Sequence, residues 1–270
     1  ILILGACSPL EGENLIDPSP AAIPTQIKVM PGDSLPDDEA SRLMYALLES
    51  SETEFKQAVE AIIAAQDTRF IPVFIELFRA NQLSLIGDID FRIPIDALEF
   101  LSGQPLGNDW PAWIEWYGKT DLIPPSGFTS WKGQLLGRID PGFSDFLQDD
   151  FPTTIRAEEI LWGGVPVDGI PALDNAAMIP ASEASYLEAE EPVFGISING
   201  DHRAYPLRIL DWHEMANDVV GGVPISLAYC TLCGAGIAYD GRASNGETYT
   251  FGSSGFLYRS NKLMYDRQTR

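Results

Sequence analysis

Two hydrophobic patterns divide the chain, and this division constrains the fold more than any other feature. Between residues 39 and 120 apolar residues recur three and four positions apart, as in Leu43, Leu47 and Leu48. That spacing is typical of amphipathic α-helices. Beyond Gly127 glycine and proline are frequent and the apolar runs are short, which favours strands and turns. We therefore predict an α+β protein, in which an all-α helical-repeat module precedes a β-rich mixed domain with one short helix.

The helical module is predicted over residues 39–120. An Arg-x-Ile-Pro signal ends at Pro72, a similar Arg-Ile-Pro signal ends at Pro94, and proline is favoured in the first turn of a helix. Three tryptophans three residues apart, at 110, 113 and 116, are expected to pack in its core. This stretch resembles HEAT-like helical repeats. The resemblance implies a packing and interaction module, so a protein partner is expected to bind here.

The β-rich domain is predicted over residues 138–270, after a linker at 121–137 where Pro124, Pro125 and Gly127 stop any helix. The Asn199-Gly200 pair predicts a β-hairpin, because both turn positions favour positive φ. Further elements follow along the chain: we expect a helix over 208–217, strands at 223–229 and 236–239 joined by a cysteine-containing connection, and two later strands separated by Gly252–Gly255.

The first residues point to export from the cytoplasm. Leu4-Gly5-Ala6-Cys7 resembles the lipobox of bacterial lipoproteins, in which an apolar segment is removed before a cysteine that carries the lipid. Residues 1–7 are therefore expected to be a residual signal peptide and lipobox, with Cys7 as the lipidation site. Residues 8–38, rich in proline and acid, are expected to be a flexible linker. The predicted location is extracytoplasmic, with a lipid anchor in the cell membrane or outer membrane.

The net charge narrows the range of partners. Seventeen Lys and Arg against 39 Asp and Glu give a formal charge of −22. Nucleic-acid binding depends on neutralising phosphates with basic side chains, so we expect no nucleic-acid partner. Anionic lipid would repel such a chain, so membrane attachment is assigned to the lipid on Cys7.

Four sequence blocks in the second half carry a family resemblance. They read WGGVPVDGIPALDN, AYPLRILDWHEMANDVVGG, SLAYCTLCGAGIAYDGR and FGSSGFLYRSNKLMYDRQT. In this order they resemble a bacterial family known as domain of unknown function 3179. Members of the family more often have proline where this chain has Thr231, and they continue past the Tyr-Asp-Arg segment, which implies that the domain extends beyond Arg270. The family brings no established activity, so the chemistry must be inferred from the residues.

The strongest chemical motif is Cys230-Thr231-Leu232-Cys233, followed by Gly234. Two thiolates at this spacing can hold one ion, and a glycine lets backbone N–H groups face the sulfurs, as in the knuckles of zinc ribbons and rubredoxins. With only two cysteines in the motif, His213 is the favoured third ligand over His202, and Met264 could add a thioether. Such a soft set suits copper first and zinc next. The first hypothesis is therefore a thiophilic metal site of Cys230, Cys233 and His213, with catalytic residues unassigned.

Two other interpretations of the pair remain open. Cys230 and Cys233 could exchange electrons as a dithiol and disulfide outside the cytoplasm, where disulfides persist. The segment after Gly234 is a poor helix former, so the pair lacks the helix N-terminus that activates thioredoxin-type cysteines. Alternatively, the pair could be a structural disulfide in a scaffold without chemistry. The sequence leaves open whether the protein is an enzyme.

Overall fold

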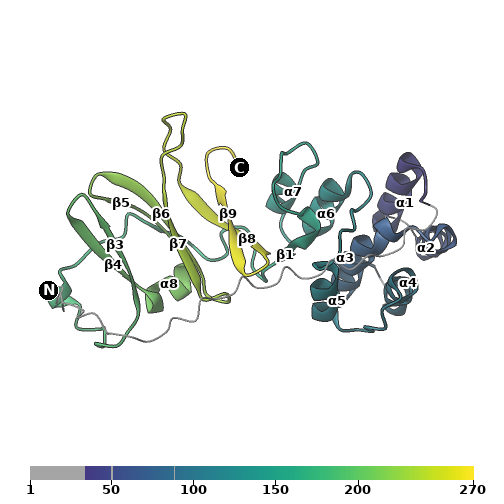
Figure 1. Cartoon of the computed structure of the whole chain (residues 1–270), viewed down its shortest axis with the longest axis horizontal. Coiled ribbons are helices and arrows are strands. Elements are labelled where there is room, and N and C mark those ends of the chain that lie inside the picture. Colours follow the sequence, from purple (N-terminus) through teal and green to yellow (C-terminus); the bar gives the residue numbers. More distant parts are fainter. Residues whose placement is uncertain (1–33, 50, 88) are drawn as a thin grey trace, which may run out of the picture.

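The computed structural model describes residues 34–49, 51–87 and 89–270, with helices gathered at one end of the molecule and β-sheets at the other (Figure 1). This arrangement confirms the predicted α+β class. The predicted lipobox cysteine, Cys7, and all but the last residues of the predicted linker lie outside this description.

Seven α-helices and one 3-10 helix form the helical half in the part of the chain that the structure describes. In order they are α1 (Asp37–Glu49), α2 (Glu52–Ala65), η1 (Thr68–Phe70), α3 (Ile71–Gln82), α4 (Arg92–Ser102), α5 (Trp110–Tyr117), α6 (Phe128–Leu136) and α7 (Gly142–Phe146). None of the helices so described is long and apolar enough to cross a membrane. The resemblance to HEAT repeats stays a prediction.

Local capping chemistry explains where several helices begin. The Ser51 side chain accepts the Glu54 N–H while the Glu54 carboxylate accepts the Ser51 N–H, which is a capping box at the start of α2. Asp109 accepts the Ala112 N–H and caps α5. Pro72 lies in the first turn of α3, as the Arg-x-Ile-Pro signal predicts.

Helix α3 lies in the centre of the helical core, with buried residues on all its sides. Trp113 and Trp116 of α5 are buried, and their rings meet edge to face at 6.0 Å. Trp110 is partly buried and lies 4.7 Å from the Arg79 guanidinium. The prediction that this tryptophan row belongs to the core is thus confirmed.

The segment 121–137, expected to be a linker, contains helix α6, so that expectation is wrong in part. Pro124 and Pro125 do end the preceding region, but Gly127 adopts a left-handed φ of 88° at the N-cap of α6. Phe128, Trp131 and Leu135 then form a buried helical face. Their three- and four-residue spacing was the signal that the prolines obscured.

A buried ion pair and its hydrogen bonds connect the helical half to the segment that follows it in the chain. The Lys132 Nζ in α6 lies 2.7 Å from Glu76 Oε1 in α3, and the Lys132 side chain is 0% exposed. The same ammonium donates to the carbonyl oxygens of Ala157 and Glu158, in the 3-10 helix η2 (Ala157–Glu159), at 3.2 and 3.4 Å. Each of the three donors therefore has an acceptor, as a buried charge requires.

The β-rich half contains two stacked sheets and a hairpin. Its elements are β1 (Ile160–Trp162), β2 (Leu173–Asp174), η3 (Ala181–Glu183), β3 (Val193–Ile198), β4 (Asp201–Pro206), α8 (Leu207–His213), β5 (Met215–Val220), β6 (Val223–Cys230), β7 (Ala235–Asp240), β8 (Phe251–Tyr258) and β9 (Asn261–Asp266). One sheet has the order β1-β8-β9 and the other β2-β5-β6-β7, while β3 and β4 pair with each other. In Figure 1 the first sheet lies next to the helices and the second beyond it.

The hairpin prediction is confirmed, and the helix prediction beside it needs a correction. Asn199 and Gly200 connect β3 to β4 with φ of 51° and 81°. The helix expected over 208–217 ends at His213, because Glu214 turns to φ 53° and Met215 begins strand β5. Pairing of β5 with β6 along its whole length outweighs the short helical pattern.

The glycines at 252 and 255 lie inside β8. The prediction that they separate two strands is therefore wrong. Gly255 has φ 81°, and the pairing of β8 with β9 shifts register between Ser253 and Leu257. A Cβ on Gly255 would lie 2.5 Å from the Val165 carbonyl oxygen. Glycine here permits a bulge and a close backbone approach; the actual turn follows Tyr258.

We expect Lys132→Ala to lower the free energy of unfolding by about 3–5 kcal/mol, because it leaves the Glu76 carboxylate buried without a partner. Denaturant unfolding followed by tryptophan fluorescence measures this loss. The matched control is Lys119→Ala, which breaks an exposed pair with Glu115 and should leave the free energy of unfolding almost unchanged. Equal losses in the two variants would refute the central role of Lys132.

Candidate functional site

The cysteine pair lies in the tight turn that joins β6 to β7. Cys230 is the last residue of β6 and pairs with Ala235, the first residue of β7. The N–H groups of Cys233 and Gly234 both donate to the Cys230 carbonyl oxygen, at 3.2 and 2.9 Å, and Gly234 has φ 62°. The predicted placement of the cysteines at a strand connection is therefore confirmed.

The two cysteines are joined by a disulfide bond, with their Cα atoms 5.2 Å apart. This bond fits the structural-disulfide interpretation of the motif. The Cys233 N–H also lies 3.2 Å from Cys230 Sγ. The backbone thus directs a donor at one sulfur, as the glycine after the motif led us to expect.

The two sulfurs have different surroundings. Cys230 is 1% exposed, whereas Cys233 is only partly buried and follows the exposed residues Thr231 and Leu232. Leu232, at the tip of the turn, is 77% exposed. A molecule that approaches the turn from solvent therefore meets residues 231–233 before Cys230.

Strand alternation explains why Cys230 is buried. On β6, Ile225, Leu227 and Tyr229 pack into the cluster formed with the β3-β4 hairpin and α8, so Ser226 and Cys230 face the opposite side. On that side the Ser226 hydroxyl donates to Asn217 Oδ1, and strand β9 contacts β6. Cys230 therefore lies in the layer between the two sheets.

Asn217 of β5 holds the two sheets together in this layer. Its amide nitrogen donates to Asp174 Oδ1 of β2 and to the Phe251 carbonyl oxygen of β8, each at 2.8 Å. Its oxygen accepts from Ser226 at 2.8 Å and from the Phe251 N–H at 3.0 Å. These bonds fix the distance and register between the sheets, as a fully satisfied buried amide can.

Strand β9 contributes Lys262 to the same layer. Its Nζ lies 3.2 Å from Glu214 Oε2 and 3.4 Å from the Glu214 carbonyl oxygen, which also accepts the Tyr229 N–H. Burial lowers the pKa of Lys262, and the Glu214 carboxylate opposes that shift. Met264, two residues further along β9, lies on the same strand face as Lys262.

The two histidines differ in exposure, and the favoured ligand, His213, has its ring bound to a backbone carbonyl oxygen. His213 is the last residue of α8, and its Nδ1–H donates to the Pro171 carbonyl oxygen at 2.8 Å. Pro171 precedes β2, which borders β5 on the side away from β6. His202 is exposed, with Nδ1 2.8 Å from Ser197 Oγ.

Among the residues that the structure describes, no group of three or more His, Cys, Asp or Glu side chains is arranged to hold a metal ion. The metal site of Cys230, Cys233, His213 and Met264 therefore stays a prediction.

Sequence reasoning missed several hydrogen-bonded polar groups inside the β-rich half. Lys262 and Asn217 were not considered, and neither was Asp168, which accepts the Tyr265 hydroxyl and the Ser253 N–H. All of them lie within the four family blocks. The alternation of β9, with Leu263 and Tyr265 packed toward the helical half, would have placed Lys262 and Met264 on the face toward Cys230.

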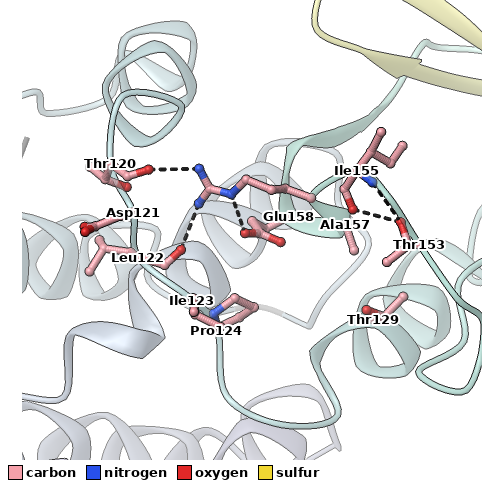
Figure 2. A pocket seen from close by; sticks show the side chains of 11 residues that line it. Thr120, Asp121, Leu122, Ile123, Pro124, Thr129, Thr153, Ile155, Ala157 and Glu158 are labelled. Atoms are coloured by element: carbon pink, nitrogen blue, oxygen red, sulfur yellow. Dashed lines mark hydrogen bonds and ion pairs between the residues drawn. The ribbon is translucent and has the colours of Figure 1, made fainter. Parts of the chain in front are cut away.

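A separate pocket of about 470 Å³ lies where the helical half meets η2. Arg156 lines this pocket, and its guanidinium donates to the carbonyl oxygens of Thr120 and Leu122 and to the Glu158 carboxylate, three residues that Figure 2 labels. These bonds commit the three guanidinium nitrogens to the protein itself. The pocket therefore belongs to the junction between the helical half and η2, and the exposed Asp121 also lines it.

Comparison with known proteins bears on the β-rich half. No curated protein and no solved structure matches this chain. Residues 167–270 match the model of a family described as "Protein of unknown function (DUF3179)", so the family resemblance of the β-rich half is confirmed over that range.

Proposed function

We propose that the β-rich domain is a thiol-disulfide redox centre, in which the Cys230–Cys233 bond opens and closes while the fold stays intact. The observation that carries this proposal is that the bond joins two residues of one tight turn. That turn is already closed by hydrogen bonds to the Cys230 carbonyl oxygen and by the full pairing of β6 with β7. The fold therefore does not depend on the disulfide to hold these strands together.

The small free energy that a disulfide contributes across such a short loop argues against a purely structural role. In the chain-entropy model, a disulfide across a four-residue loop contributes about 2 kcal/mol, less than the roughly 3 kcal/mol of a 15-residue loop. Accessibility points the same way, because Cys233 is partly exposed in a turn that reaches solvent. A disulfide that contributes little and can be reached by a thiol suits exchange better than permanent support.

We expect the native protein to equilibrate with glutathione redox buffers, with a potential above the roughly −300 mV below which structural disulfides lie. The fraction of reduced pair is measured by acid quenching, alkylation and mass spectrometry, in a Cys7→Ser background. Circular dichroism under the same buffers should remain unchanged. Reduction that occurs only after unfolding would instead support the scaffold interpretation.

The compartment follows from the same proposal. A disulfide is maintained outside the reducing cytoplasm, and the lipobox-like sequence at Cys7 provides a means of export and attachment. We propose a lipid-anchored, extracytoplasmic protein with this redox domain held near the membrane surface.

In a bacterial host with a complete leader, the protein should partition into the detergent phase of Triton X-114. The Cys7→Ser variant should move to the aqueous phase, because attached acyl chains contribute about 0.8 kcal/mol per buried methylene. The matched control, Cys233→Ser, should stay in the detergent phase. Aqueous partitioning of the unmodified protein would contradict the anchor.

Metal binding by the reduced pair is a second candidate, favoured by the contacts of His213. A metal-ligating histidine commonly donates its other ring N–H to a carbonyl oxygen, and His213 Nδ1 does so to Pro171. Its Nε2 would then be the ligating atom, beside the thiolates of Cys230 and Cys233, with Met264 as an added ligand. Copper or zinc suits this set.

Titration of the anaerobically reduced protein with Cu(I) or Zn(II), in competition with a chromogenic chelator, tests this candidate. We expect one metal per chain, an affinity lowered by at least about tenfold in His213→Ala, and no change in the control His202→Ala. Equal affinities in the two histidine variants would exclude His213 from the site.

A further inference from the structure

The two sulfurs of the pair differ in access, and this difference assigns them separate roles. The inference rests on the proposed redox function and deepens it. We propose that Cys233 is the sulfur attacked by an incoming thiolate, and that Cys230 is the sulfur that leaves.

The two sulfurs differ in how easily an incoming thiolate can reach them. Exchange at sulfur proceeds by attack of a thiolate on one sulfur of the disulfide, with departure of the other, so it depends on which sulfur is accessible. Attack on Cys233 requires approach from the side away from Cys230, past the exposed residues of the turn. Attack on Cys230 would require approach to a residue that is 1% exposed.

The packed side chains between the two sheets block the approach of a thiolate to Cys230. Cys230 is on the face of β6 that carries Ser226, and Ser226 is bonded to Asn217, which is bonded in turn to β8. Strand β9 contacts β6, and Lys262 reaches the Glu214 carbonyl oxygen that also accepts the Tyr229 N–H. Cys230 follows Tyr229 along the chain and is 1% exposed, so its sulfur is enclosed by protein.

The backbone favours Cys230 as the leaving group. The Cys233 N–H lies 3.2 Å from Cys230 Sγ. When the bond breaks, the negative charge develops on this sulfur, and a hydrogen bond to an anionic acceptor is stronger than one to a neutral acceptor. A better stabilised thiolate is a better leaving group.

The complete exchange balances with a dithiol as the reductant. One thiolate of the dithiol bonds to Cys233 Sγ, the Cys230–Cys233 bond breaks, and Cys230 Sγ keeps the electron pair and then takes a proton from solvent. The second thiolate of the dithiol attacks its own partner sulfur in the mixed disulfide and releases Cys233 as a thiolate, which is protonated. Two electrons pass from the dithiol to the pair, and the two protons that the dithiol releases to solvent when it ionises balance the two that Cys230 and Cys233 take up.

The mixed disulfide tests this assignment without altering either cysteine of the pair. The folded Cys7→Ser protein is treated with reduced glutathione, quenched in acid, alkylated with iodoacetamide after unfolding, and peptide-mapped. We expect glutathione on Cys233 and the alkyl group on Cys230, in at least about tenfold excess over the reverse pattern. Glutathione mainly on Cys230, or equally on both, would overturn the assignment while leaving the redox function standing.

Single-thiol variants give an independent measurement. In folded Cys230→Ser, the Cys233 thiol should react with oxidised glutathione at least about tenfold faster than the Cys230 thiol does in folded Cys233→Ser. In denaturant the two rates should converge, which separates access from intrinsic reactivity. If the native disulfide reacts with no thiol at all, the redox function itself fails and this assignment fails with it.

Discussion

The buried charge of Lys132 is the interaction on which the placement of the other elements depends. Its ammonium binds Glu76 and the carbonyl oxygens of Ala157 and Glu158, so it fixes the start of the segment that enters β1. The neighbouring Glu159 pairs with Arg259, at the turn between β8 and β9. Because β1 pairs with β8 and β8 with β9, these contacts connect the helical half to the sheet that lies next to it in Figure 1, whose strand β9 contacts β6.

The layer between the two sheets is polar, which is unusual for the interior of stacked sheets. Asn217, Ser226 and the Lys262–Glu214 pair occupy it, and each has hydrogen-bond partners there. Such groups cost free energy if the sheets slide, because each displaced bond leaves a buried donor or acceptor unpaired. Hydrogen bonds of this kind therefore favour one alignment of the two sheets over others. The cysteine turn follows the end of β6, so Cys230 is buried while Cys233 is partly exposed.

Features encoded by local sequence could be predicted, and features that need distant partners could not. The Asn199-Gly200 hairpin and the α+β division follow from turn chemistry and periodicity, and the structure has both. The prediction of a helix over 208–217 is wrong in its second half, because the residues from Met215 onward form strand β5 and pair with β6. The motif itself gave no reason for Cys230 to be buried and Cys233 partly exposed. Burial of Cys230 depends on tertiary packing around β6, and the contact of β6 with β9, about 30 residues later in the chain, is one that no local pattern could reveal.

The disulfide and the proposed metal site would be alternative states of one turn. A metal requires thiolates, and a disulfide contains none, so the oxidation state of the pair decides whether ligation can occur at all. The backbone N–H directed at Cys230 Sγ would stabilise a thiolate in either setting, whether it is newly released from the disulfide or bound to an ion. Oxidising conditions outside the cytoplasm favour the closed form. A metal would therefore compete for the pair only when a reductant has first opened it, so the proposed exchange at Cys233 would come first in both proposed functions.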